Sequence, residues 1–121
     1  MGLLQSLQQI QPPTIQKIET PEWTAANITH VFVRAGTANR RDAMESFWLD
    51  RKGSDRSGFR AVVAAFYLCD EAGTWAFDVR DVADAVVALG NQDARPVQRI
   101  FDAAAKLNSF TPEDESELVK N

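Results

Sequence analysis

A long apolar run in the middle of the chain constrains the fold more than any other feature. Between Gly58 and Gly73, large apolar residues recur at helical spacing. They stand at Phe59, Val62, Val63, Phe66 and Tyr67, and Cys69 ends the run. Because apolar residues would cover nearly every side of such a helix, the pattern predicts a helix buried in a core. The Asp70-Glu71 pair followed by Gly73 predicts a tight turn, since glycine adopts positive φ at no steric cost.

The remaining periodicity predicts a hairpin followed by helices. Segments 14–20 and 28–34 are rich in β-branched residues and predict two paired strands. Further helices are expected at 39–52, 79–89, 95–107 and 112–120. The expected N-caps of the first, second and last of these are Asn39, Asp78 and Thr111. The predicted fold class is mainly α with a small N-terminal β-hairpin (α+β), a compact single domain of four to five helices.

The first residues form a separate pattern. Leu3, Leu4, Leu7 and Ile10 make a short apolar stripe among glutamines, and two prolines at 12 and 13 end it. An isolated helix this short is marginal in water unless it docks on a surface. Residues 1–13 are therefore interpreted as an amphipathic arm, either mobile or packed on the domain, and residues 14–121 as one domain.

Length and composition exclude several classes of protein. A chain of 121 residues is long enough to bury one hydrophobic core that needs no disulfide bond or metal ion to hold it together. Cys69 is the only cysteine, so no internal disulfide can form, and its place in the apolar run predicts a small buried side chain. The longest uncharged apolar run, 61–69, is far shorter than the ~20 residues of a membrane span. We therefore expect no membrane association, and the N-terminus lacks the basic segment of a secretory signal.

The residues that carry chemistry do not form a recognisable site. His30 is the only histidine and has no histidine or cysteine near it in the sequence, so a metal site is not expected. Most acidic residues stand at helix caps or on polar faces, where they stabilise helices. The glycines at 53 and 58 are not followed by the Lys-Ser/Thr pair of a phosphate-binding loop. We expect no enzyme activity, no metal and no cofactor.

Charge is unevenly distributed along the chain. Segment 34–60 holds seven basic and four acidic residues, whereas segment 70–121 holds five basic and eleven acidic residues. This split argues against nucleic-acid binding, which uses a basic face, and would permit head-to-tail self-association of a basic with an acidic patch. A helix-turn-helix alternative would expose Arg95, Gln98, Arg99 and Lys106. Asp93 and Asp102 flank that face and would oppose contact with phosphates.

Several phrases together resemble a known family. The phrases are P-E-W at 21–23, V-F-V-R at 31–34, T-A at 37–38, R-D-A-M-E at 41–45, the run from Arg60 to Phe77 with C-D-E-A-G, the segment from Val97 to Asn108, and L-V-K-N at 118–121. Each phrase is degenerate, but their joint order over residues 21–121 is similar to that of the tail assembly chaperones of long-tailed (siphovirus-type) bacteriophages and prophages.

This resemblance implies a function based on binding and release. Tail assembly chaperones bind the aggregation-prone tape measure protein in the host bacterial cytoplasm and pass it to the major tail tube protein. They are absent from the mature virion. The expected partner-binding residues of this chain are Phe47, Trp48, Trp75, Phe77, Leu118 and Val119. The alternative is a structural or head–tail joining protein that stays in the virion.

Overall fold

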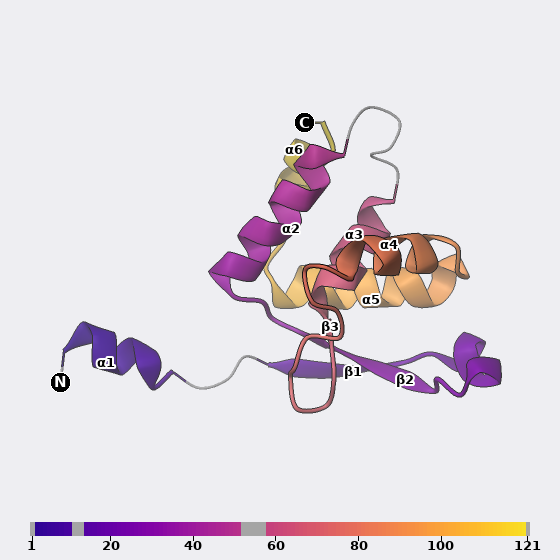
Figure 1. Cartoon of the computed structure of the whole chain (residues 1–121), viewed down its shortest axis with the longest axis horizontal. Helices are drawn as coiled ribbons and strands as arrows, with labels where there is room; N and C mark the ends of the chain where they lie inside the picture. The colour runs from indigo at the N-terminus through magenta and orange to yellow at the C-terminus, as the bar shows by residue number, and fades with distance from the viewer. Residues whose placement is uncertain (1, 11–13, 52–57, 121) are drawn as a thin grey trace.

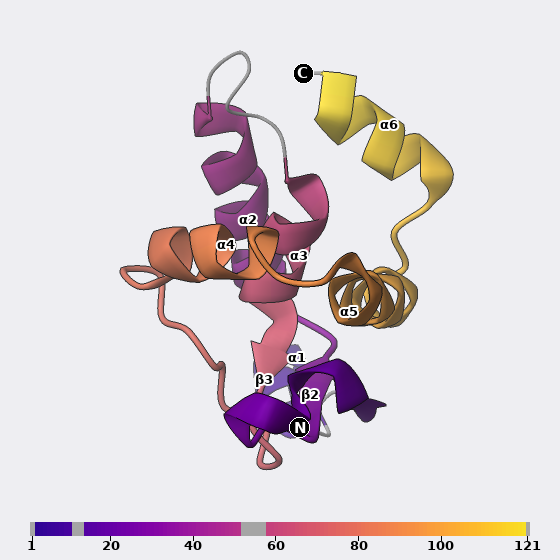
Figure 2. The same ribbon diagram turned by 90° about the vertical axis from the view of Figure 1, so that its right-hand side faces the viewer.

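The computed structural model describes residues 2–10, 14–51 and 58–120. The elements are, in chain order, α1 (Leu3–Gln8), β1 (Ile15–Glu19), the 3₁₀ helix η1 (Pro21–Ala26), β2 (His30–Arg34), α2 (Ala38–Asp50), α3 (Phe59–Tyr67), β3 (Leu68–Cys69), α4 (Val82–Gly90), α5 (Ala94–Leu107) and α6 (Pro112–Lys120). The sheet lies at one side and α3 stands above it, with α2, α4 and α5 packed around α3 (Figures 1 and 2). The predicted fold class is therefore confirmed.

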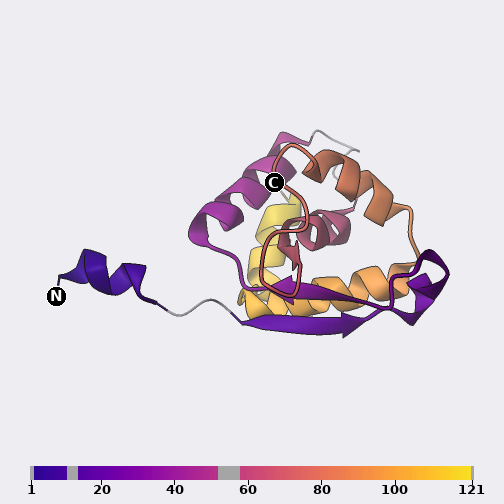
Figure 3. The same cartoon turned by 60° about the horizontal axis from the view of Figure 1, so that its bottom comes forward.

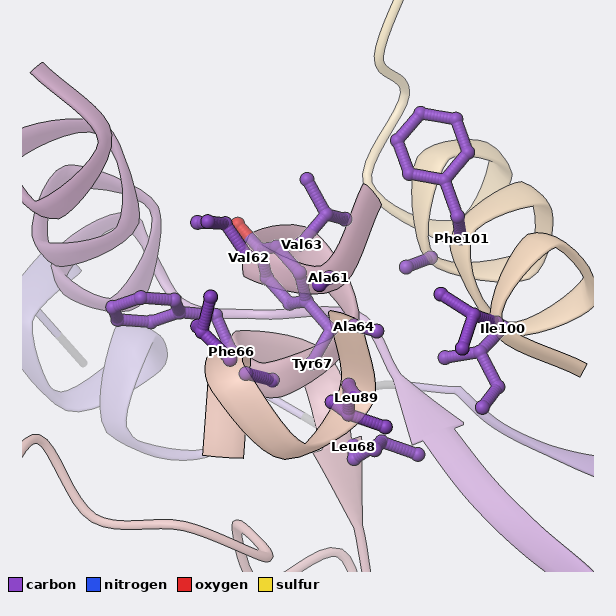
Figure 4. Packing of buried hydrophobic residues seen from close by; sticks show 14 of the residues in the cluster. Ala61, Val62, Val63, Ala64, Phe66, Tyr67, Leu68, Leu89, Ile100 and Phe101 are labelled. Atoms are coloured by element: carbon purple, nitrogen blue, oxygen red, sulfur yellow. The ribbon is translucent and has the colours of Figure 1, made fainter. Parts of the chain in front are cut away.

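The core is built around α3, as the apolar run predicts. Every residue of α3 from Ala61 to Tyr67 is buried, so this part of the helix has no solvent-facing side. Leu89 of α4 lies close to the end of α3, and Ile100 and Phe101 of α5 face it from the other side (Figure 4). Packing of this kind, rather than helix propensity, supplies most of the stability of so short a helix.

The apolar run does not remain helical to its end, contrary to the prediction. The helix stops at Tyr67, and Leu68–Cys69 forms β3, a third antiparallel strand beside β2. The strand order is β1-β2-β3, with Ile15 opposite Arg34 and Phe32 opposite Cys69. A short apolar stretch fits a buried strand as well as a helix. Here it becomes a strand because it pairs with the open edge of β2.

The predicted turn after this run is confirmed. Gly73 has a φ of +91°, in the left-handed region that favours glycine. The Asp70 carboxylate accepts hydrogen bonds from the N–H groups of Ala72 and Thr74, both at 2.9 Å. This turn brings Trp75 back beside Cys69 and extends the sheet by one bridge.

Two predicted helix starts are wrong. Thr37, not Asn39, caps α2, because the Thr37 hydroxyl accepts from the Arg40 N–H at 3.0 Å. The described helix ends at Asp50, and the predicted end at residue 52 lies outside the described residues. Asp78 caps only a turn, since its carboxylate accepts from Arg80 and Asp81, and α4 begins at Val82.

The last two helices follow the prediction closely. Pro96 lies in the first turn of α5, where its missing N–H removes no helical hydrogen bond. The N–H of Thr111 donates to the Asp114 carboxylate, and the N–H of Asp114 donates to the Thr111 hydroxyl, both at 3.0 Å. This reciprocal pair starts α6 in the manner of a capping box.

Helix α1 stands apart from the rest of the molecule (Figures 1 and 3). Its apolar stripe faces solvent, and Leu3, Leu4, Leu7 and Ile10 are each between 54% and 76% exposed. Both prolines expected to end this helix, at 12 and 13, lie outside the described residues. The arm therefore does not pack on its own domain.

Candidate functional site

The described residues include no metal-binding cluster. Among residues 2–10, 14–51 and 58–120, no three His, Cys, Asp or Glu side chains cluster in a way that could hold a metal ion. The exposed His30 Nδ1 shares a hydrogen bond of 3.0 Å with the Thr29 hydroxyl. Burial raises the pKa of the Cys69 thiol, so little of the reactive thiolate forms at neutral pH. Within the described ranges, no helix is long and apolar enough to cross a bilayer.

Four of the predicted partner-binding residues lie on α2 and α6, and two of them, Trp48 and Leu118, meet where these helices touch. Trp48 is only 1% exposed, and its indole N–H donates to the backbone carbonyl of Leu118 at 2.6 Å. Its ring packs edge-on against Phe59 at 5.0 Å between centroids. Trp48 is therefore a core residue of the single chain. Phe47 is half-buried against Phe66, whereas Val119 remains 48% exposed.

The other two predicted residues lie in the segment between β3 and α4. The half-buried Trp75 ring is held between two guanidinium groups, with Arg34 at 4.3 Å and Arg40 at 4.5 Å from its centroid. Phe77 is half-buried, and its carbonyl accepts a hydrogen bond from Arg40 at 2.9 Å. These aromatic residues therefore fix the loop to the domain, far along the chain from the α2–α6 contact.

Phe77 also lines an apolar pocket that sequence reasoning did not find. The pocket is built by η1, β2, β3 and α4 and has a volume of about 320 Å³. Its lining residues, which define the apolar pocket below, are Trp23, Ala26, Ile28, Val31, Leu68, Phe77, Ala85, Ala88, Leu89 and Gln92. None of them carries a charge. The P-E-W phrase at 21–23 is the part of the sequence that pointed to this pocket, because its Trp23 side chain forms one wall.

An ion pair holds the wall formed by η1 in place. The Arg99 guanidinium of α5 binds the Glu22 carboxylate and also donates to the Glu19 carbonyl at 2.8 Å. The hydrogen bond from Arg99 is the main reason that the pKa of Glu22 lies below its ordinary value. Beside it, the buried indole N–H of Trp23 has no acceptor among the described residues. The pocket is thus a built feature of the fold, anchored from α5.

The basic side chains are largely engaged within the domain. Arg95 binds the Asp93 carboxylate at 2.6 Å, and Arg99 binds Glu22, so both arginines of the helix-turn-helix alternative are paired with carboxylates. In the basic segment, Arg34 donates to the Gly73 carbonyl at 2.7 Å and Arg41 binds Glu45 at 2.7 Å. These contacts reduce the positive surface available to phosphates or to an acidic patch of another molecule.

Comparison with known proteins relates this fold to one solved structure. No family model matches the sequence, and no curated protein matches it. The structure is similar to that of the tail assembly chaperone of bacteriophage HK97, with a TM-score of 0.56 and 15% sequence identity. The match covers 89% of this chain and 95% of the HK97 chain. The chain therefore has the fold of a phage tail assembly chaperone, the family that its sequence phrases resemble.

Proposed function

We propose that this chain is a phage tail assembly chaperone that acts without catalysis. It binds the tape measure protein, keeps it soluble in the host cytoplasm and aids polymerisation of the major tail tube protein around it. The observation that carries this proposal is the agreement between the resemblance in sequence and the similarity in fold. The ordered phrases cover residues 21–121, and the fold likeness covers nearly the whole of both chains.

The contact between α2 and α6 is the favoured surface for the tape measure protein. A chaperone of this kind must cover apolar helical stripes, and accessible apolar side chains on a pair of helices suit an incoming amphipathic helix. Val119 of α6 is exposed, and Phe47 of α2 and Leu118 of α6 are half-buried beside the core. Partial exposure allows a weak contact that can be released when the tail tube grows. Trp48 contributes by holding α6 in place.

Inactivation of the gene in its own phage or prophage tests this role. We expect normal heads without tails by electron microscopy, and restoration of tails when the intact chain is supplied from a plasmid. Antibody blots of purified virions should then lack the chain, because a chaperone leaves before the particle is complete. A stoichiometric amount of the chain in the virion would replace the proposal with a head–tail joining role.

A further inference from the structure

The apolar pocket is a feature that the proposed function leaves unused. Among its lining residues, Leu68, Ala85 and Leu89 are buried and form its floor. Ala26 of η1 and Ala88 of α4 are exposed and form its rim. Because alanine side chains are small, the backbone of another molecule can approach this rim closely.

The size and the lining of the pocket fit a bulky apolar side chain. Its volume of about 320 Å³ is ample, since an apolar cavity of about 150 Å³ already holds a benzene ring. An apolar side chain that enters the pocket removes apolar surface of both molecules from water, which is favourable. The hollow between β1 and α5 differs, because Lys17, Asp102 and Lys106 line it and would lose their hydration.

Two acidic side chains stand beside the pocket on α4. Asp81 is the N-cap of the helix and Asp84 lies in its first turn, and both are exposed. Each precedes a lining residue, Ala85 or Ala88, by one helical turn, so each carboxylate lies on the same side of α4 as that residue. The pocket therefore has an acidic border at one end.

The cations nearest to this border in the sequence are already paired. Arg80 lies 3.5 Å from the Asp78 carboxylate, and Arg95 binds the Asp93 carboxylate at 2.6 Å. Within the described ranges, no ion pair involves Asp81. The same is true of Asp84. The border therefore keeps its negative charge and attracts a positively charged partner.

We propose that the apolar pocket binds a helix of a partner protein in which a bulky apolar residue is flanked by lysine or arginine. The apolar side chain enters the pocket, the helix crosses the alanine rim between η1 and α4, and the basic residues lie near Asp81 and Asp84. Apolar burial supplies the affinity, and the carboxylates select the partner. This binding is independent of the proposed function, which places the tape measure protein at the α2–α6 contact.

Synthetic helical peptides added to the full chain test this proposal. Three labelled peptides share one leucine stripe and differ only beside it, where they carry lysine, glutamine or glutamate. Fluorescence anisotropy measures their affinities. We expect the lysine peptide to bind about three- to tenfold more tightly than the glutamine peptide, and the glutamate peptide to bind most weakly. Added salt should bring the three affinities together, because it screens exposed charges.

Substitutions on α4 show whether the carboxylates cause this preference. Asp81→Asn/Asp84→Asn should remove the preference for lysine and leave the affinity for the glutamine peptide unchanged. The Asp81 side chain accepts no capping hydrogen bond, so its replacement removes no cap. Asp42→Asn/Asp50→Asn is the matched control, because it removes two exposed charges of α2, which does not line the pocket.

A substitution at the rim tests the apolar part of the site. Ala88→Glu places a charge where the apolar side chain enters and should weaken binding of the glutamine peptide by at least about tenfold. Ala83→Glu adds the same charge at an exposed position of α4 outside the pocket lining and should bind this peptide like the parent chain. Circular dichroism of each variant verifies its fold.

Several results would overturn the proposal. Equal affinities for the three peptides at low salt would remove the role of the carboxylates. An Ala88→Glu chain that binds like the parent would place the peptide elsewhere. A change in the sedimentation of the chain alone on Ala88→Glu would show that a second copy, not a basic helix, occupies the pocket. No tape measure protein takes part in these measurements, so their failure is distinct from a failure of the proposed function.

Discussion

Arg40 is a buried cation that binds carbonyl groups and aromatic rings. Its guanidinium donates to the Phe66 carbonyl at 2.8 Å and to the Phe77 carbonyl at 2.9 Å, and it lies over the rings of Phe66 and Trp75. These contacts tie the end of α3 to the segment that leads into α4. Burial lowers the pKa of Arg40 below its ordinary value, but a guanidinium group stays protonated at neutral pH.

Replacing Arg40 should therefore cost stability. Arg40→Met leaves two carbonyls without donors, and we expect a loss of about 2–4 kcal/mol in the free energy of unfolding. Arg40→Lys should lose less, because it keeps the charge and one donor. Arg80→Met is the matched control, since the Arg80 side chain is 92% exposed. Urea unfolding measures all three, and equal midpoints for Arg40→Met and Arg80→Met would contradict this role.

Tyr67 provides a direct test of core burial. It is the only tyrosine, it is buried, and burial raises its pKa from 10.0 to about 12. The raised value favours the neutral phenol in the folded state, so stability should be constant below pH 10.0 and fall as pH rises towards about 12. The tyrosinate absorbance should appear near pH 12 and together with unfolding. Titration near the ordinary value in a chain that stays folded would contradict the packing.

The loop that joins β2 to α2 packs closely on α3. A Cβ on Gly36 would lie 2.5 Å from the Tyr67 ring. The Gly36 N–H donates a hydrogen bond of 2.7 Å to the side chain of Asn108, which directly follows α5. Absence of a side chain at this position therefore lets the sheet, α3 and the end of α5 meet.

Substitution by alanine tests this close approach. We expect Gly36→Ala to cost about 1–3 kcal/mol, because the buried Tyr67 ring has little space to move. Gly90→Ala is the control, since a Cβ there meets nothing within 4 Å and alanine favours the helix. Thermal unfolding should lower the midpoint only for Gly36→Ala. A Gly36→Ala chain as stable as the parent would show that this contact is loose.

The elements also show what sequence reasoning can and cannot predict. The buried helix and α5 follow from the spacing of their apolar residues, and the hairpin follows from its β-branched residues. β3 does not, since two apolar residues after a helix carry no period, and only the neighbouring β2 makes them a strand. The start of α4 was misplaced because Asp78 and Asp81 are both plausible caps, and Val79 between them proved 65% exposed.

The candidate site was harder to predict than the fold. Phe47 and Trp48 are adjacent on the same helical stripe, and spacing does not tell which of them the core takes. The pocket could not be derived either, because its walls come from four elements between Trp23 and Gln92. Such a hollow depends on how the elements pack, and no local pattern in the sequence reports it.

The whole molecule presents two apolar surfaces at separate places. The apolar pocket lies beside η1, whereas the α2–α6 contact lies at the far side of the helical layer (Figures 1 and 2). Val119 does not line the apolar pocket, so a change at Val119 tests the α2–α6 contact without altering the pocket.

Co-expression with the tape measure protein encoded beside this chain tests the central proposal most directly. We predict that the tape measure protein becomes soluble and co-purifies with the chain. Val119→Asp should lower the soluble fraction, while Val79→Asp should not, because Val79 is also an exposed valine but lies away from α6. A tape measure protein that stays insoluble beside the chain, or that is equally soluble without it, would contradict the account.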